Sequence, residues 1–269
     1  MELIDFEYAG QRLSDMGLMM CSFGTTGDET TDIGNVREMN NVKSARADIY
    51  YSVGSSYSDT FAPTFSICKN PCVPNTTDYF TEEEVHQIVR WLNRPKYEKF
   101  VPIYDDGSFS DVYFMVTFNL TLEKAAGKVA GFNLEFMTNA PYGFQEPVTV
   151  SYQGVTTFTI TDESDEIGAI WPEMTITCKE SGDLSIASNQ MKYNSLIKGC
   201  TAEETITFSG LTKQISTNKE SHKDIHKGDF NFIFPFVGNT YSDRTNTFTF
   251  SIPVDVTLTY SPIRKVGIV

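Results

Sequence analysis

Apolar and polar residues alternate with a period of two along most of this chain, which is the pattern of β-strands that bury one face. The longest alternation covers residues 111–122, and the turn signal Asp105-Asp106-Gly107 precedes it. Tyr113 and Met115 lie on its second face, so this strand carries apolar side chains on both sides. The residues that share the first face are Val112, Phe114, Val116, Phe118, Leu120 and Leu122.

Shorter alternations predict several further strands, at residues 156–161, 204–208, 229–236, 247–252 and 255–260. Residues 174–178 and 184–186 also alternate, and the turn residues between them predict a β-hairpin. Within residues 229–236, a period of two places four aromatic side chains on one face: Phe230, Phe232, Phe234 and Phe236.

One segment has helical periodicity instead. Thr81 and Glu84 have the spacing of a capping box, and Phe80 before the cap can pack on the fourth helical residue as a hydrophobic staple. Pro95 ends the helix because proline disfavours helical geometry at the residue before it. The expected buried face has the spacing i, i+3, i+4, i+7 and consists of Val85, Ile88, Val89 and Leu92.

The turn-rich stretch at residues 138–143 divides the chain into two parts. The part before it mixes strands with one helix, and the part after it consists of short, regularly spaced strands, as in a β-sandwich or jelly roll. We therefore expect a mainly β chain of the β-rich α+β class. Its first domain would cover residues 1–140, and a β-sandwich would begin at residue 141.

The net charge of the chain excludes some classes of binding partner. The chain of 269 residues has 35 acidic and 21 basic side chains, giving a formal net charge of −14. Duplex DNA and anionic lipid both require Lys and Arg to neutralise phosphates, so we expect no specific nucleic acid and no membrane insertion. The first ten residues include three acids and no base, unlike a secretory signal, which indicates synthesis in a cytoplasm.

The sequence contains few residues in the patterns of catalytic or metal-binding sites. The five cysteines are scattered, so we interpret them as ordinary thiols. His222 and His226 have the i, i+4 spacing of two zinc ligands, with Asp229 as a third candidate, but the glutamate of a metalloprotease motif is missing. No phosphate-binding loop or nucleophile elbow is present. We expect no metal, no cofactor and no enzymatic activity.

Several segments, written with their first and last positions, stand out together: FEYAGQRLSDMG (6–17), MCSF (20–23), FSICKNPC (65–72), RWLNRP (90–95), GFNLEFMTNAP (131–141), GDFNFIFP (228–235), NTFTF (246–250) and YSPIRKVG (260–267). Together they resemble the distal tail protein family of long-tailed, siphovirus-type phages and prophages. The resemblance is strong over residues 1–141 and at the last residues, and it is looser between them.

This resemblance implies a structural virion protein at the phage tail tip or baseplate, assembled in the bacterial host cytoplasm. Such a protein would form a hexameric ring that joins the tail tube protein to the tail-associated fibre or hub protein and to the receptor-binding protein. It also implies that the first domain builds the ring and is completed by a C-terminal strand at about residues 255–269. Residues 141–254 would then form a galectin-like β-sandwich.

Closed rings use heterologous contacts, in which one patch meets a different patch on the neighbouring copy. The candidate interface residues are Asp105, Asp106 and Gly107 in the turn and Tyr113 and Met115 on the second face of the long strand. The alternative is that this strand is buried on both sides within one chain.

Two other functions remain open. The chain could be a carbohydrate-binding β-sandwich that mediates host attachment without catalysis. Trp171 is then a candidate glycan contact, since sugars stack on exposed aromatic rings, although Trp171 is equally suited to a core or to a wedge between domains. No sugar-binding motif can be matched. A glycan-degrading enzyme is the third alternative, but no pair of carboxylates stands out for that reaction.

Overall fold

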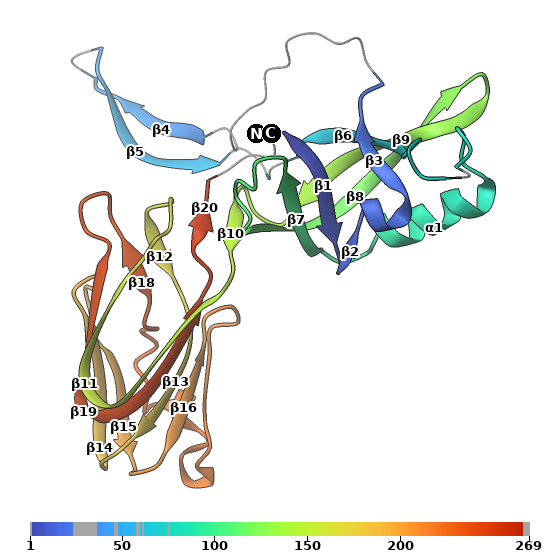
Figure 1. Cartoon of the computed structure of the whole chain (residues 1–269). Helices are drawn as coiled ribbons and strands as arrows, with labels where there is room; N and C mark the ends of the chain where they lie inside the picture. The colour runs from blue at the N-terminus through green and yellow to red at the C-terminus, as the bar shows by residue number, and fades with distance from the viewer. Residues whose placement is uncertain are drawn as a thin grey trace. The chain divides into compact units, whose positions relative to one another are not determined.

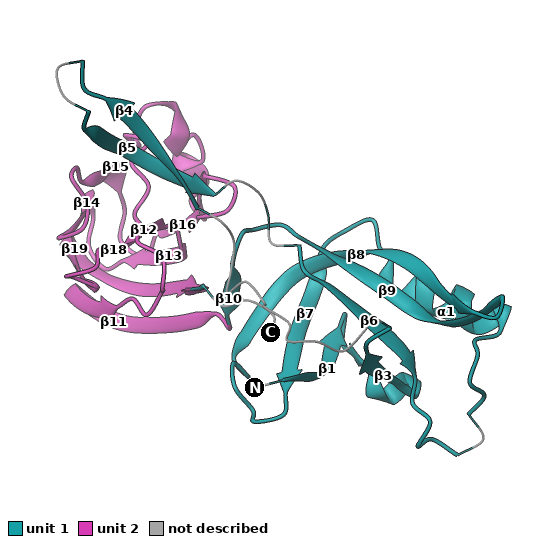
Figure 2. Ribbon diagram, turned by 90° about the horizontal axis from the view of Figure 1, so that it is seen from above, with its two compact units in different colours: residues 1–145, 264–269 teal, residues 146–263 magenta. Residues whose placement is uncertain are grey.

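The computed structural model describes residues 2–23, 37–45, 48–57, 60, 62–74 and 76–265. The chain divides into two compact units, residues 1–145 with 264–269 and residues 146–263 (Figure 2). Strands dominate both units, and the helix α1 (Glu82–Leu92) belongs to the first (Figure 1). The prediction of a mainly β chain with one helix in its first part is confirmed. Among the described helices, none combines the length and the apolar character that a membrane crossing requires.

A nine-stranded sheet forms the body of the first unit, with the strand order β2-β1-β7-β8-β9-β6-β3 and with β10 pairing to β8 and β20. From β2 to β3, and between β8 and β10, neighbouring strands of this sheet are antiparallel. The elements are β1 (Leu3–Tyr8), β2 (Gln11–Arg12), the 3-10 turn η1 (Ser14–Met16), β3 (Leu18–Cys21), β6 (Thr64–Lys69), β7 (Glu98–Tyr104), β8 (Val112–Ala125), β9 (Lys128–Thr138), β10 (Gly143–Gln145) and β20 (Ile263–Arg264).

The core of this unit is aromatic. The long predicted strand is β8, and its residues alternate between buried and half-buried from Val112 to Phe118, as its pattern predicts. Phe118 and Phe136, which face each other across β8 and β9, have ring centroids 5.6 Å apart. Leu122 is exposed although it shares the face of Phe118, because β7 pairs only with residues 114–116 and the end of β8 extends beyond it.

Helix α1 begins as its sequence predicts. The Thr81 hydroxyl accepts a hydrogen bond from the Glu84 N–H at 3.3 Å, and the Glu84 carboxylate accepts one from the Thr81 N–H at 2.7 Å. One predicted position is wrong: Val89 is exposed, and Trp91 is buried in its place. The reason lies outside the helix, since the Trp91 indole N–H donates to the Tyr8 carbonyl of β1 at 3.1 Å.

A second, separate sheet in the first unit is the antiparallel hairpin of β4 (Arg37–Lys43) and β5 (Tyr50–Tyr57). In the part of the chain that the structure describes, these two strands pair only with each other. No pattern in the sequence analysis predicted them.

The second unit consists of a seven-stranded sheet, with the strand order β15-β14-β19-β13-β16-β17 and with β11 pairing to β19, and of a two-stranded sheet, β12-β18. Its elements are β11 (Val148–Thr161), β12 (Gly168–Ile170), β13 (Glu173–Cys178), β14 (Gly182–Ser188), β15 (Ser195–Cys200), β16 (Thr205–Ser209), β17 (Gln214–Thr217), the 3-10 turns η2 (Glu220–His222) and η3 (Ile225–Lys227), β18 (Val237–Asn239) and β19 (Thr245–Tyr260).

The predicted hairpin of residues 174–186 is wrong. Both strands, β13 and β14, exist, but each pairs antiparallel with β19 and not with the other: β13 pairs with residues 254–259 and β14 with residues 248–250. The predicted strands at 247–252 and 255–260 are in fact this one strand, which continues through Pro253. Proline has no N–H to donate, but its carbonyl still accepts a hydrogen bond, here from the Lys179 N–H at 2.9 Å.

Because β19 is one strand, residues 255–260 lie with residues 245–254 in the second unit. Residues 255–263 stay in the second unit, and the chain returns to the first unit only at Arg264, where β20 pairs with β10.

The strand predicted at 229–236 is absent. Phe230 makes one isolated bridge to Ile197, and Phe232 is exposed with a left-handed backbone. The four phenylalanines therefore do not share a strand face.

Candidate interaction surfaces

The predicted turn connects β7 to β8 and is tied to the start of the chain. The Asp105 carboxylate accepts a hydrogen bond from the Glu2 N–H at 2.9 Å. Hydrogen bonds from Ser108 lower the pKa of Asp106, whose carboxylate accepts the Ser108 N–H at 3.0 Å. Gly107 has a φ of 72°, in the left-handed region where glycine is unstrained. These contacts explain the residue types of the turn locally, and its role in a ring interface stays a prediction.

The second face of β8 is partly covered within the chain. Tyr113 lies opposite Phe144 of β10, with the ring centroids 5.8 Å apart, and the Lys99 ammonium is 4.9 Å from the Tyr113 ring. Met115 lies opposite Lys99 in β7. Tyr113 and Met115 both remain half-buried. This face is therefore partly open. It is neither fully buried within the chain nor fully free for a neighbouring copy.

The β4–β5 hairpin is the surface that the sequence analysis missed. The Arg37 guanidinium donates to the Tyr57 hydroxyl at 2.9 Å and lies 4.7 Å from the Tyr57 ring, at the open end of the hairpin. Farther along, the hairpin exposes large apolar side chains, among them Val53 with 69% of its surface accessible. The others are Met39, Val42, Ile49, Tyr50 and Tyr51. The alternation from Tyr51 to Tyr57 was the available signal.

Apolar side chains occupy both faces of this hairpin. Residues that are opposite each other in an antiparallel pair point to the same side. Val42 lies opposite Tyr51, and the next pair, Lys43 and Tyr50, points to the other side. An isolated two-stranded hairpin is at best marginally stable in water, and exposed apolar patches mark interaction sites. The hairpin therefore has the chemistry of a segment that binds another protein surface.

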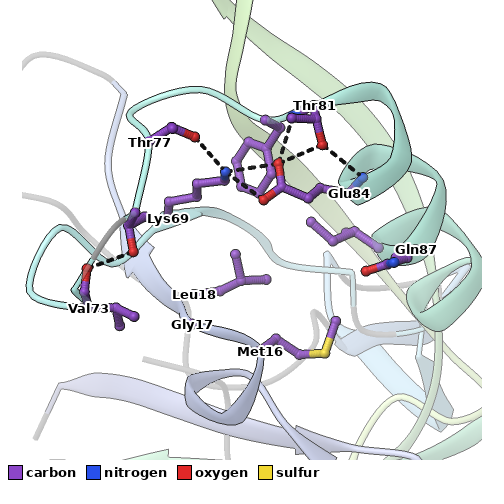
Figure 3. Close-up of a pocket in the computed structure, with 12 residues that line it drawn as sticks. Met16, Gly17, Leu18, Lys69, Val73, Thr77, Thr81, Glu84 and Gln87 are labelled. Atoms are coloured by element: carbon purple, nitrogen blue, oxygen red, sulfur yellow. Dashed lines mark hydrogen bonds and ion pairs between the residues drawn. The ribbon is translucent and has the colours of Figure 1, made fainter.

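A cleft of about 390 Å³ lies beside the start of α1 (Figure 3). The Lys69 ammonium donates to both Glu84 oxygens, at 2.7 and 2.8 Å, and to the Thr77 hydroxyl at 3.0 Å. Burial acts to raise the pKa of Glu84, but the hydrogen bonds from Lys69 and Thr81 outweigh it and lower that pKa. The charges neutralise each other, so this arrangement fastens α1 to β6 and leaves the cleft no charge for a ligand.

Trp171 follows β12 in the second unit and is 45% exposed. The Lys213 ammonium lies 3.4 Å from the centre of its ring and 5.9 Å from the ring of Phe234. Burial disfavours the charged form and lowers the pKa of Lys213 to about 8. One face of the indole is thus already covered by a cation. Contact between Trp171 and a glycan stays a prediction.

The histidine pair does not converge on a metal site. His222 Nδ1 is 2.6 Å from a carboxylate oxygen of the fully buried Glu204, and His222 Nε2 is 3.8 Å from Asp229. His226 instead lines a cleft on the second unit with Phe232. Over the described ranges, no group of three or more His, Cys, Asp or Glu side chains could hold a metal ion. All five cysteines are free thiols.

Comparisons with known proteins agree with this two-part architecture. Residues 1–140 match the family model of the phage tail protein N-terminal domain, and residues 142–260 match that of the phage tail C-terminal domain. No curated protein sequence compared with this chain is significantly similar to it.

At least one of the matching solved structures shares the fold. It is the Dit protein of phage SPP1, described as a paradigm of the hub adsorption apparatus in phages that infect Gram-positive bacteria. The alignment has a TM-score of 0.62 at 11% identity and covers 97% of this chain and 99% of Dit. The baseplate of phage p2 in its activated conformation with Sr aligns with a TM-score of 0.41 at 10% identity, over 96% of this chain and 97% of that one.

Proposed function

This chain belongs to the phage tail protein family whose N- and C-terminal domains it matches, and we propose that it is the ring-forming hub of a tail tip. The resemblance to distal tail proteins seen in the sequence is confirmed, and the chain is a structural component of the virion tail. In the proposed hub, a hexameric ring joins the tail tube protein to the tail-associated fibre or hub protein and to the receptor-binding protein.

The observation that carries the ring proposal is the β4–β5 hairpin. Its apolar side chains are exposed on both faces, and its strands pair only with each other in the described part of the chain. A second copy of the chain is the partner that this arrangement fits. A closed ring places one patch of each copy on a different patch of the next, and an apolar hairpin with a partly open sheet face provides two such patches.

The receiving patch in this proposal is the second face of β8. Tyr113 and Met115 are half-buried there and offer apolar surface beside the Lys99 ammonium. The hairpin of one copy would cover these side chains on the neighbour, together with the turn that contains Asp105 and Asp106. This pairing combines the predicted interface residues with the hairpin.

The fold likeness to Dit supports the role at the adsorption apparatus, because that protein is described as its hub. A structural family also favours a role without catalysis. We propose that the second unit faces the adsorption proteins, while the first unit builds the ring and is completed by the returning strand β20, which pairs with β10.

The mass of the purified full chain tests the proposal. Light scattering and negative-stain electron microscopy should report a hollow ring of about six copies. The double variant Val42→Asp with Tyr51→Asp places two charges on one hairpin face and should give a folded monomer, with the same circular dichroism spectrum and melting temperature.

Tyr241→Asp is the matched control, since Tyr241 is a highly exposed aromatic residue of the second unit. That variant should keep the ring. A wild-type chain that remains monomeric at every concentration, or a hairpin double variant that still forms the ring, would overturn the proposal.

A further inference from the structure

A cleft of about 320 Å³ opens over β16 and β17 in the second unit. Two aromatic rings form one side of it. Phe232 is 63% exposed and lies 5.5 Å from the ring of Phe230, while Phe234 lies 5.2 Å from the same ring. Because Phe230 is buried, it holds an exposed ring in a defined place. The volume is at the lower end of the roughly 300–1,000 Å³ of small-molecule sites.

Backbone strain marks the same cleft. Phe232 has a φ of 59° and Lys213 a φ of 53°, and both side chains line the cleft. The left-handed region costs energy for residues other than glycine, and such strain concentrates where a side chain must be presented to a ligand. Core packing does not account for Phe232, since most of its surface is in solvent.

Polar residues of the two strands also line the cleft. Thr207 of β16 lies opposite Ser216 of β17, and Gln214 is two residues farther along that strand. Within the ranges that the structure describes, these three side chains make no hydrogen bond or ion pair. Hydroxyl and amide groups both donate and accept hydrogen bonds, as the hydroxyls of a sugar require.

The charge at this cleft is opposite to that of the chain. Lys213 lines it beside His226, and among the residues that the structure describes no acidic side chain lines it, although the chain has 35 acids and 21 bases. The carboxylate of Glu173, beside the lining residue Ser209, accepts hydrogen bonds from the Ser209 hydroxyl at 2.9 Å and the Leu211 N–H at 3.4 Å. The Lys213 ammonium lies 3.4 Å from the centre of the Trp171 ring, a cation–π contact that leaves its N–H groups able to donate to an anion.

We propose that this cleft binds a sugar that carries a carboxylate or phosphate group. The sugar ring stacks on Phe232, because its C–H bonds meet the electron-rich face of the aromatic ring, and its acidic group meets the Lys213 ammonium. Trp171 then acts as a positioning residue for Lys213. All of these residues belong to one unit of one chain, so the site does not depend on ring formation.

Saturation-transfer NMR on the full-length protein tests the site with three probes: glucose, glucose 6-phosphate and glucuronate. The ring protons of the two acidic sugars should receive saturation, and those of glucose much less. Lys213→Gln should weaken binding of the acidic sugars roughly tenfold, because it removes one charge-assisted hydrogen bond. Phe232→Gly should abolish the signal without lowering the melting temperature, since glycine relieves the strained backbone.

Tyr193→Ala is the matched control, because Tyr193 is 62% exposed and also has a lysine ammonium, that of Lys192, 5.2 Å from its ring. It should bind the acidic sugars as the wild type does. Three results would overturn the proposal: no saturation of either acidic sugar, unchanged binding by both Phe232→Gly and Lys213→Gln, or displacement by inorganic phosphate with no saturation of sugar ring protons, which would indicate a simple anion site.

Discussion

Two antiparallel hairpins of the first unit use similar side chains in opposite ways. In the hairpin of β8 and β9, the inward side chains from Val112 to Phe118 are buried in an aromatic core. In the hairpin of β4 and β5, side chains of the same types, such as Val53 and Tyr50, lie in solvent. The first hairpin finds its partners within the chain, and the second does not find them among the described residues.

This difference indicates that the apolar side chains of one hairpin stabilise the folded monomer, whereas those of the other stabilise the assembly. Burying a large apolar side chain contributes roughly 1.5–3 kcal/mol, so the core residues of β8 stabilise the monomer itself. The same side chains on β4 and β5 contribute that free energy only when another surface covers them. Substitutions in β8 and β9 should therefore change the free energy of unfolding, and substitutions in β4 and β5 should change the assembly.

The largest effect on folding is expected at the centre of the aromatic core. Phe118 is fully buried and lies 5.1 Å from Tyr8 and 5.6 Å from Phe136, ring to ring. Phe118→Ala should lower the free energy of unfolding by about 3–5 kcal/mol, because it removes apolar contacts and leaves a cavity. Chemical denaturation measures this. Tyr51→Ala in the other hairpin is the control, and an equal loss there would refute the distinction.

The polar cluster around Glu204 in the second unit likewise finds its partners within the chain. Burial acts to raise the pKa of Glu204, but hydrogen bonds from Thr217, the Thr201 N–H and His222 outweigh it, so the pKa is lowered. A carboxyl whose pKa is lower in the folded state stabilises the fold above its unfolded value of about 4.3, and this contribution is lost as the pH falls through the folded value.

Glu204→Gln should therefore cost about 1–3 kcal/mol at neutral pH, because buried donors lose a charged acceptor. The difference from the wild type should shrink as the pH falls below about 4.3. Thermal unfolding of both proteins between neutral and acidic pH measures it. A difference that is constant with pH would show that the charge of Glu204 does not stabilise the second unit.

The side chains on the second face of β8 are intermediate in burial between those of the aromatic core and those of the β4–β5 hairpin. Tyr113→Asp together with Met115→Asp should break the ring and leave the monomer folded. Since both side chains are half-buried, we expect a loss of about 1–2 kcal/mol in the monomer. Light scattering that still reports the full assembly would exclude this face from the ring interface.

Local patterns predicted the parts of the fold that depend on neighbours in sequence. The capping box of Thr81 and Glu84 and the alternation from Val112 to Phe118 are both confirmed. The hairpin of residues 174–186 is wrong because the partner of both strands, β19, comes about seventy residues later, and such pairing leaves no local signal. Val89 is exposed because the helix position relative to β1 is set by Trp91.

The candidate sites were harder to predict for the same reason. Trp171 was recognised by residue type, but Lys213 comes to its ring through the pairing of β16 and β17. Phe232 was assigned to a strand face, whereas its left-handed backbone presents it to a cleft. Exposure of the β4–β5 hairpin depends on what the rest of the chain leaves uncovered, which alternation alone does not reveal.

Hydrogen exchange tests most directly whether the β4–β5 hairpin is covered by another copy. We predict that amides of β4 and β5 exchange at least roughly tenfold more slowly in the assembled protein than after dissociation by dilution, because a lone hairpin opens easily in water. Amides at the centre of β8 and β9 should exchange equally slowly in both states. If the hairpin amides exchange equally fast in both states, the hairpin does not form the ring contact, and the central claim is contradicted.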